Sequence, residues 1–158
     1  MAAAMPSLPL CITGFEQVAK VERESVVYGV IRDLIWTTDA GGARRLAHNQ
    51  EVLATLPEDE GGPLLWRAMF SSQAARDLGC AYQSSLIHFG LTCRGLEYEW
   101  ASWMHAFETL LRRLYWVQAK VHLETEGAAQ HVFIWEPEQD FHGPDMPMAL
   151  RCAWERID

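Results

Sequence analysis

The sequence lacks several features that define large classes of protein. Its four cysteines are scattered, without a Cys-x-x-Cys pair or the dense framework that small secreted domains need. No stretch approaches the roughly 18 apolar residues of a transmembrane helix, so we expect no membrane span. Residues 1–11 contain two prolines and no basic region, so we also expect no signal peptide. These absences favour free thiols and a reducing, cytoplasmic setting.

Basic residues are also scarce. The chain has 13 Lys and Arg against 21 Asp and Glu, which gives a formal net charge of −8. Such a charge repels phosphate backbones and anionic membrane surfaces, and it attracts basic partners. We therefore expect a basic protein as the partner, and neither nucleic acid nor a membrane. Acidity that serves solubility alone is the other explanation, and the sequence leaves it open.

Common catalytic and metal-binding motifs are missing as well. The chain has no GxxxxGK[ST], GxSxG, GxGxxG or HExxH pattern, which removes the main motif-defined enzyme classes. Six histidines are present, but the only pairing at helical spacing is His105-x-x-Glu108. Zinc and di-iron sites need more ligands at such close spacing. We predict no metal and no cofactor.

The first half of the sequence indicates helices. At 158 residues the chain fits a single domain, which we expect over residues 10–158 after a loose N-terminal arm over residues 1–9. Apolar residues recur at helical spacing, and glycines and prolines separate the periodic segments. The predicted helices span residues 22–36, 43–56 and 64–78.

The second half contains the strand signals. Residues 85–93 alternate in character, which predicts a strand with Gly90 at a bulge or a close backbone approach. Residues 130–135 are apolar on both sides, which is typical of a strand inside a sheet. One long helix is predicted between these strands. Residues 148–157 fit either a helix or a strand.

These elements predict an α+β fold. Three N-terminal helices precede a strand, a long helix and a second strand, and the helices cover a small sheet. On the long helix, Trp100, Trp103 and Phe107 begin an apolar stripe that we expect to face the core. The stripe continues through Leu110, Leu114, Val117 and Val121.

The opposite side of the predicted long helix carries an unexplained indole. Trp116 falls there with Arg112 and His105, and the core stripe does not account for it. Tryptophan and arginine are frequent interface anchors, so this face is a candidate contact for a partner or for a homodimer. The alternative is that another helix of the same domain covers it.

The main functional prediction is a non-enzymatic, acidic, cytoplasmic protein-binding module of the inhibitor, immunity or adaptor type. Acidic loops would speed the association with a basic partner, and aromatic anchors would supply most of the affinity. The acidic side chains of these loops are Glu58, Asp59, Glu60, Glu136, Glu138 and Asp140.

A small enzyme or ligand-binding domain is the alternative. Its pocket would lie between the sheet and the central helix and would contain His88, His131 and Glu99, because imidazole titrates near neutral pH. Histidines in apolar strands are more often packed residues, and the sequence does not show whether His88 and His131 are adjacent.

Overall fold

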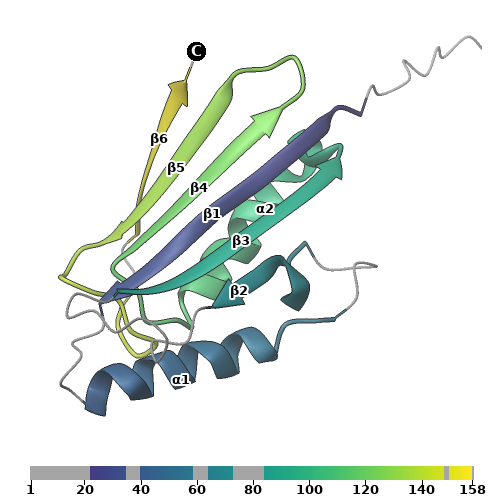
Figure 1. The fold of residues 1–158 in the computed structure, drawn as a ribbon. Coiled ribbons are helices and arrows are strands. Elements are labelled where there is room, and N and C mark those ends of the chain that lie inside the picture. Colours follow the sequence, from purple (N-terminus) through teal and green to yellow (C-terminus); the bar gives the residue numbers. More distant parts are fainter. Residues whose placement is uncertain (1–21, 35–39, 59–63, 73–83, 148–149, 158) are drawn as a thin grey trace, which may run out of the picture.

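An antiparallel sheet of six strands forms the centre of the fold (Figure 1). The computed structural model describes residues 22–34, 40–58, 64–72, 84–147 and 150–157. The predicted N-terminal arm, residues 1–9, lies outside these residues. The strand order is β2-β3-β1-β4-β5-β6, so the first strand of the chain lies in the middle of the sheet.

Helices interrupt the described strands at two places along the chain, between β1 and β2 and between β3 and β4. Two α-helices are present in this part of the molecule. In chain order the elements are β1 (Glu24–Leu34), α1 (Ala40–Ala54), a 3-10 turn (Arg67–Met69), β2 (Phe70–Ser72), β3 (Ser84–Arg94), α2 (Leu96–Leu111), β4 (Gln118–Thr125), β5 (Gln130–Pro137) and β6 (Leu150–Ile157).

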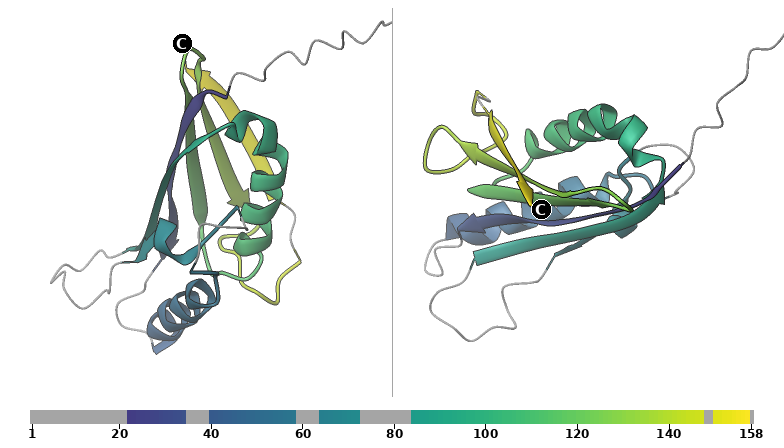
Figure 2. Two further views of the ribbon diagram at one scale, coloured as in Figure 1. Left: turned by 90° about the vertical axis from the view of Figure 1, so that its right-hand side faces the viewer. Right: turned by 90° about the horizontal axis from the view of Figure 1, so that it is seen from above.

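The sheet has one covered face and one open face. Helix α2 packs along one face, and α1 lies at the end of the sheet where β1 ends (Figures 1 and 2). No described helix lies on the other face, which we call the open face. Neither described helix has the length and apolar character needed to cross a membrane.

The core lies between α2 and the covered face. Alternate β1 residues, Val27 and Ile31 among them, are buried there, while Tyr28 points to the open face. From α2, Trp103 and Phe107 stack at 5.1 Å between ring centroids and are fully buried. Burial of side chains of this size stabilises the fold by roughly 1.5–3 kcal/mol each. These aromatic side chains of α2 therefore serve mainly to stabilise the fold.

Two of the three fully buried indoles donate hydrogen bonds. Trp135 Nε1 donates to Glu108 Oε1 at 3.0 Å, which ties β5 to α2. Trp116 Nε1 donates to the Leu111 carbonyl at 2.9 Å. The buried Trp103 Nε1 has no hydrogen-bond partner among the described residues.

The prediction of three N-terminal helices is wrong. The segment predicted as the first helix, residues 22–36, contains the central strand β1. Its apolar residues fit a helical spacing, but they also alternate, with Ser25, Val27 and Ile31 buried on the covered face. Its four β-branched valines and isoleucines between residues 26 and 31 favour a strand, because their branched side chains pack well on a pleated surface.

Two further helix predictions need correction. The predicted helix 64–78 begins instead with a 3-10 turn and the short strand β2, and residues 73–83 lie outside the described part of the chain. The long central helix ends at Leu111, and β4 begins at Gln118 after a connection of six residues. In β4, Ala119, Val121 and Leu123 are buried while the residues between them are less so, which is the alternation of a strand.

Other predictions are confirmed. The helix predicted over residues 43–56 is α1, and the strands predicted over residues 85–93 and 130–135 are β3 and β5. Strand β5 pairs with both β4 and β6, so it lies inside the sheet. The ambiguous segment 148–157 contains a strand, β6. Gly90 stands directly opposite Tyr28 in a continuous register, so the bulge predicted there does not form.

Candidate functional site

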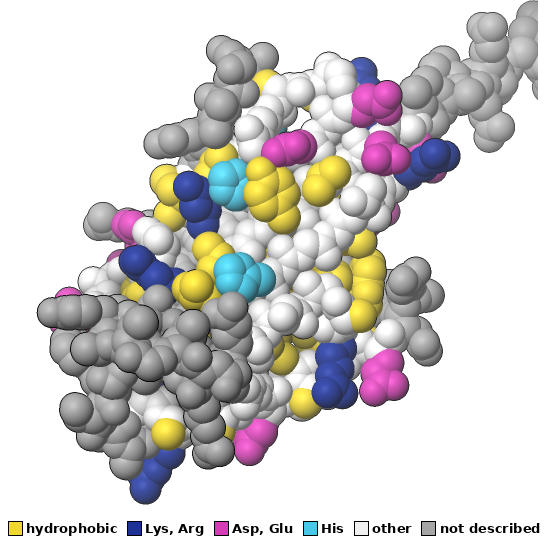
Figure 3. All heavy atoms as spheres, in the orientation of Figure 1, with side chains coloured by type: hydrophobic (Ala, Val, Ile, Leu, Met, Phe, Trp, Pro, Cys, Tyr) yellow, Lys and Arg dark blue, Asp and Glu magenta, His cyan; other side chains and the backbone are white. Residues whose placement is uncertain are grey.

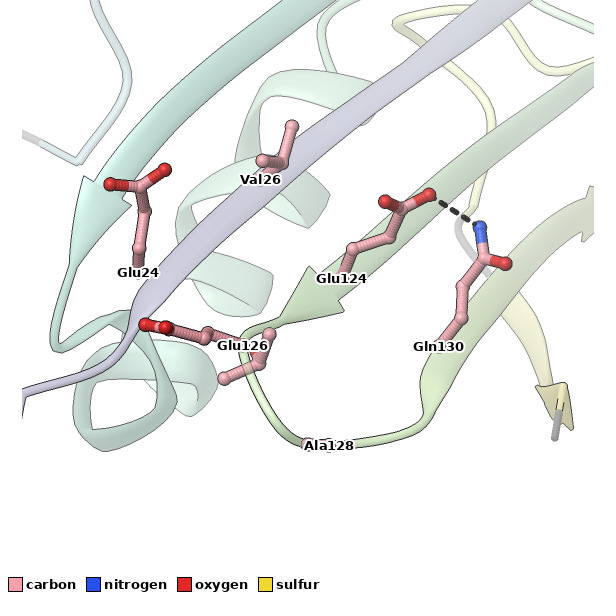
Figure 4. Close-up of a pocket in the computed structure, with 7 residues that line it drawn as sticks. Glu24, Val26, Glu124, Glu126, Ala128 and Gln130 are labelled. Carbon is pink, nitrogen blue, oxygen red and sulfur yellow. Dashed lines mark hydrogen bonds between the residues drawn. The ribbon is translucent and has the colours of Figure 1, made fainter.

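An acidic groove lies on the open face, at the end of the sheet where β1 begins. Three of its side chains, Glu24, Glu124 and Glu126, come from the start of β1, the end of β4 and the turn that follows (Figure 4). The groove has a volume of about 580 Å³. Its lining residues are Glu24, Val26, Glu124, Thr125, Glu126, Ala128 and Gln130, and none of these is basic.

The pairing of β1 with β4 brings these carboxylates together. The strands are antiparallel, and Val26 lies opposite Glu124. The Glu126 backbone N–H donates to the Glu24 carbonyl at 2.9 Å, which extends the pairing into the turn. The turn itself contains Gly127 with φ 69°, a left-handed conformation that glycine adopts without strain. Residues about 100 positions apart in the chain therefore share one surface.

Tyr28 and Gln130 connect the groove to the centre of the open face. The Tyr28 hydroxyl donates to Glu124 Oε1 at 2.7 Å, and Gln130 Nε2 donates to the same oxygen at 2.8 Å. The Tyr28 ring stacks on the His122 imidazole with 4.8 Å between centroids and 5° between planes. Tyr28 remains 37% exposed, so its ring is available for contact.

The electrostatics of this cluster follow from the same contacts. The hydrogen bond to Glu124 raises the pKa of Tyr28, and burial and the Glu124 charge act in the same direction. Burial lowers the pKa of His122, Lys120 adds to the effect, and Glu124 opposes it. At neutral pH the cluster therefore presents a neutral phenol and a neutral imidazole beside a carboxylate.

Further glutamates lie at the same end of the sheet as the groove. We call this region the acidic end of the molecule. Its glutamates are Glu22, Glu24, Glu97, Glu99, Glu124 and Glu126. Two arginines, Arg23 and Arg94, lie among them, and acidic and basic side chains both appear at the upper right of Figure 3. The Arg23 backbone N–H donates to Glu97 Oε1 at 3.4 Å, which places the start of α2 beside the start of β1.

The structure does not bring Trp116 to the surface beside Arg112 and His105. Trp116 is 0% exposed, and its backbone pairs with His142 in an isolated bridge. Arg112 is the exposed C-cap of α2, and His105 is exposed on that helix. The helical geometry that placed the three residues on one face fails because α2 ends before Trp116. A homodimer built on the Trp116 side chain loses its basis for the same reason.

The described acidic residues of the two predicted loops lie apart. Glu58 is exposed shortly after the C-terminal end of α1, and Asp59 and Glu60 lie outside the described residues. Glu136, near the end of β5, and the following Glu138 and Asp140 are exposed. The next residue, Phe141, lies over Arg45 in the first half of α1. Glu58 and the acidic residues after β5 thus lie near opposite halves of α1.

The predicted histidine pocket is not assembled. His88 is exposed on the open face of β3, whereas His131 on β5 lies on the covered face opposite the buried Leu123. Strands β1 and β4 separate the two histidines, and Glu99 is exposed in the first turn of α2. The described residues contain no group of three or more His, Cys, Asp or Glu that could hold a metal ion.

Tyr28, Glu24, Glu124 and Gln130 were not among the predicted site residues. A signal for Glu124 exists in the sequence, because Lys120, His122 and Glu124 alternate with apolar residues, as expected of a strand with one polar face. Comparisons of the chain with protein-family models, with curated proteins and with solved structures found no match.

Proposed function

We propose that this chain is a non-enzymatic protein-binding module that receives a basic segment of a partner protein in the acidic groove of the open face. The observation that carries the proposal is that Glu24, Glu124 and Glu126 line one groove, with Glu124 hydrogen-bonded to the exposed Tyr28. Inhibitor, immunity or adaptor roles all fit this activity, because each acts through binding. The cysteine pattern favours the cytoplasm as its location.

Charge and shape both support a basic partner. Three carboxylates line the groove and no basic residue is among its described lining residues, so a lysine or arginine side chain gains attraction on entering it. An exposed tyrosine ring next to carboxylates also favours binding of a cation. The cation–π interaction with the face of such a ring stabilises the complex by about 0.5–1 kcal/mol at exposed sites. The protein's overall charge of −8 would speed the encounter.

The fold explains why the groove remains open. A sheet that carries α2 on one face needs a second layer only where its other face is apolar, and here Lys120, His122 and Glu124 make that face polar along β4. The carboxylate of Glu124 is held by two donors, so its position is fixed before a partner arrives. Preorganisation of this kind reduces the entropy lost on binding.

Binding of designed peptides tests the proposal. A flexible peptide of about twelve residues containing several Lys and Arg should bind with an affinity that falls as salt increases, whereas a peptide with Gln at those positions should not bind. The double variant Glu24→Gln/Glu126→Gln should weaken binding at least about tenfold. Neither side chain makes a described hydrogen bond or ion pair, so the fold should persist.

A second double variant provides the matched control. Glu51→Gln/Glu138→Gln removes the same charge from exposed positions on α1 and on the loop after β5. It should change the affinity by less than about threefold, the effect expected of long-range charge alone at physiological salt. Equal losses in both double variants, or an affinity indifferent to ionic strength, would overturn the assignment of the groove.

A further inference from the structure

A second cavity, of opposite character, lies beside the first half of α1. It has a volume of about 460 Å³, within the usual range for small-molecule sites. Its lining residues are Gly41, Arg44, Arg45, His48, Tyr115 and Phe141. None of these described lining residues is acidic, although the chain as a whole has a charge of −8. The described lining of the cavity thus carries two guanidinium groups on an acidic protein.

Arg45 forms the fixed wall of this cavity. Its guanidinium makes a bidentate ion pair with the buried Asp33 at the end of β1. The same guanidinium lies over two rings, 5.1 Å from the Tyr115 centroid and 4.6 Å from the Phe141 centroid. Asp33 balances the charge of Arg45, and the contacts hold both rings in place. Arg45 is thus a positioning residue.

Arg44 and His48 are the groups left to meet a ligand. Arg44 is exposed and has no hydrogen bond or ion pair with another described residue. His48 Nε2 donates to the Arg113 carbonyl at 2.9 Å, which directs the proton to that nitrogen and leaves Nδ1 without a described partner. A guanidinium with five donors and no acceptor recognises the oxygens of a carboxylate or a phosphate.

The exposed ring of Phe141 favours a ligand that also carries a flat ring. Phe141 is 37% exposed at the cavity, and one of its faces is covered by Arg45. A flat ring on a ligand can stack against such a side chain, a contact worth about 0.5–1.5 kcal/mol beyond the buried area. The cavity thus offers an anion-binding group and a stacking surface together.

We propose that this cavity binds a small organic anion that carries a planar ring, with the anionic group on Arg44 and the ring against Phe141. Mononucleotides and aromatic carboxylates share this chemistry. The site is independent of the acidic groove, because it lies at the opposite end of β1 and uses charges of the opposite sign (Figure 1).

Titration of the full-length protein with four probes tests the proposal and separates the two ligand sources. The probes are adenosine 5′-monophosphate, benzoate, adenosine and inorganic phosphate, with binding measured by calorimetry and by NMR of the backbone amides around Tyr115. Saturable binding of the mononucleotide or of benzoate is expected. The probe that binds more tightly shows whether the ligand is a mononucleotide or an aromatic carboxylate. Adenosine and phosphate should each bind at least about tenfold more weakly, since each lacks one of the two contacts.

Two substitutions and a control complete the test. Arg44→Gln should weaken binding of the preferred probe at least about tenfold, and Phe141→Leu should weaken it to a smaller extent. Arg94→Gln, which removes the same charge from an exposed position on β3, should leave binding unchanged. The proposal is overturned if neither ring-bearing anion binds, if phosphate alone binds as tightly, or if Arg44→Gln and Arg94→Gln have equal effects.

Discussion

The side chain of Asn49 hydrogen-bonds both backbone polar groups of Tyr115. Its Nδ2 donates to the Tyr115 carbonyl at 2.8 Å, and its Oδ1 accepts from the Tyr115 N–H at 2.8 Å. Asn49 is only 2% exposed, so these bonds are shielded from water. Through this pair, α1 holds the connection between α2 and β4, the segment that also supplies Tyr115 to the cavity described above.

Asn49→Ala is therefore expected to destabilise the protein by about 2–4 kcal/mol. The substitution leaves two buried backbone groups without partners, and each such group costs roughly 1–3 kcal/mol. Urea denaturation followed by tryptophan fluorescence measures the change. The exposed neighbour Gln50 is the control, and Gln50→Ala should change stability by no more than about 0.5 kcal/mol. A loss below about 1 kcal/mol in Asn49→Ala would contradict this account of the helix attachment.

Gly29 and Gly90 give a matched pair of predictions on adjacent strands. A Cβ at Gly29 would press on the Lys120 carbonyl and lie 2.6 Å from Phe89 Cζ, whereas a Cβ at Gly90 meets nothing closer than 3.8 Å. Gly29→Ala should destabilise by roughly 1–3 kcal/mol or more, because β1 and β4 must separate. Gly90→Ala should be tolerated within about 0.5 kcal/mol. Thermal unfolding compares the two variants, and similar melting temperatures would show that the sheet adapts at Gly29.

The α+β class, α1, β3 and β5 were predictable from the sequence because local patterns specify them. Strand β1 was not, because a run such as Val26–Ile31 satisfies the spacing of a helix and that of a strand alike. Whether this run forms a helix or a strand depends on β3 and β4, which lie far along the chain and pair with it on both sides. Tertiary context of this kind overrides local spacing.

The site was harder to predict than the fold for a related reason. Glu24 and Glu124 share a groove because of the register between β1 and β4, and no local pattern specifies a register between segments 100 residues apart. Trp116 was placed on the wrong surface because the helix was extended past Leu111. The helix ends about three turns before the last predicted stripe residue, Val121, and the direction of every later side chain therefore differs from the prediction. An error in helix length thus became an error in the predicted site.

Tyr28 should titrate above its ordinary pKa, because its hydroxyl donates to Glu124 and loses that bond on ionisation. The absorbance change of the phenolate, taken as the difference between the natural protein and Tyr28→Phe, isolates this group. Glu124→Gln should lower the pKa of Tyr28 towards 10.0, because the charge that opposes ionisation is removed. Glu126→Gln, at the same groove without a bond to Tyr28, should have little effect. A larger effect of Glu126→Gln than of Glu124→Gln on the pKa of Tyr28 would contradict the assigned hydrogen bond.

His122 should make the protein less stable as the pH falls below about 6.5. The folded state lowers the pKa of this imidazole from 6.5, chiefly by burial and with a contribution from Lys120, while Glu124 acts in the opposite sense. Just below the ordinary pKa, the unfolded chain therefore binds more protons than the folded one, and the free energy of unfolding decreases with falling pH. Protonation of Nδ1 also removes the acceptor that faces Gln130 Nε2 at 3.4 Å.

Denaturation midpoints measured between about pH 5 and pH 8 test this dependence. His122→Gln should reduce the loss of stability on the acidic side, whereas His105→Gln, at an exposed position on α2, should retain it. An NMR titration of the His122 ring should show the lowered pKa directly, and Lys120→Gln should move it part of the way back to 6.5. Because the imidazole stacks on Tyr28, the same titration should shift the ring resonances of that tyrosine. Acid sensitivity that persists unchanged in His122→Gln would assign the effect to other groups and remove His122 from the electrostatics of the open face.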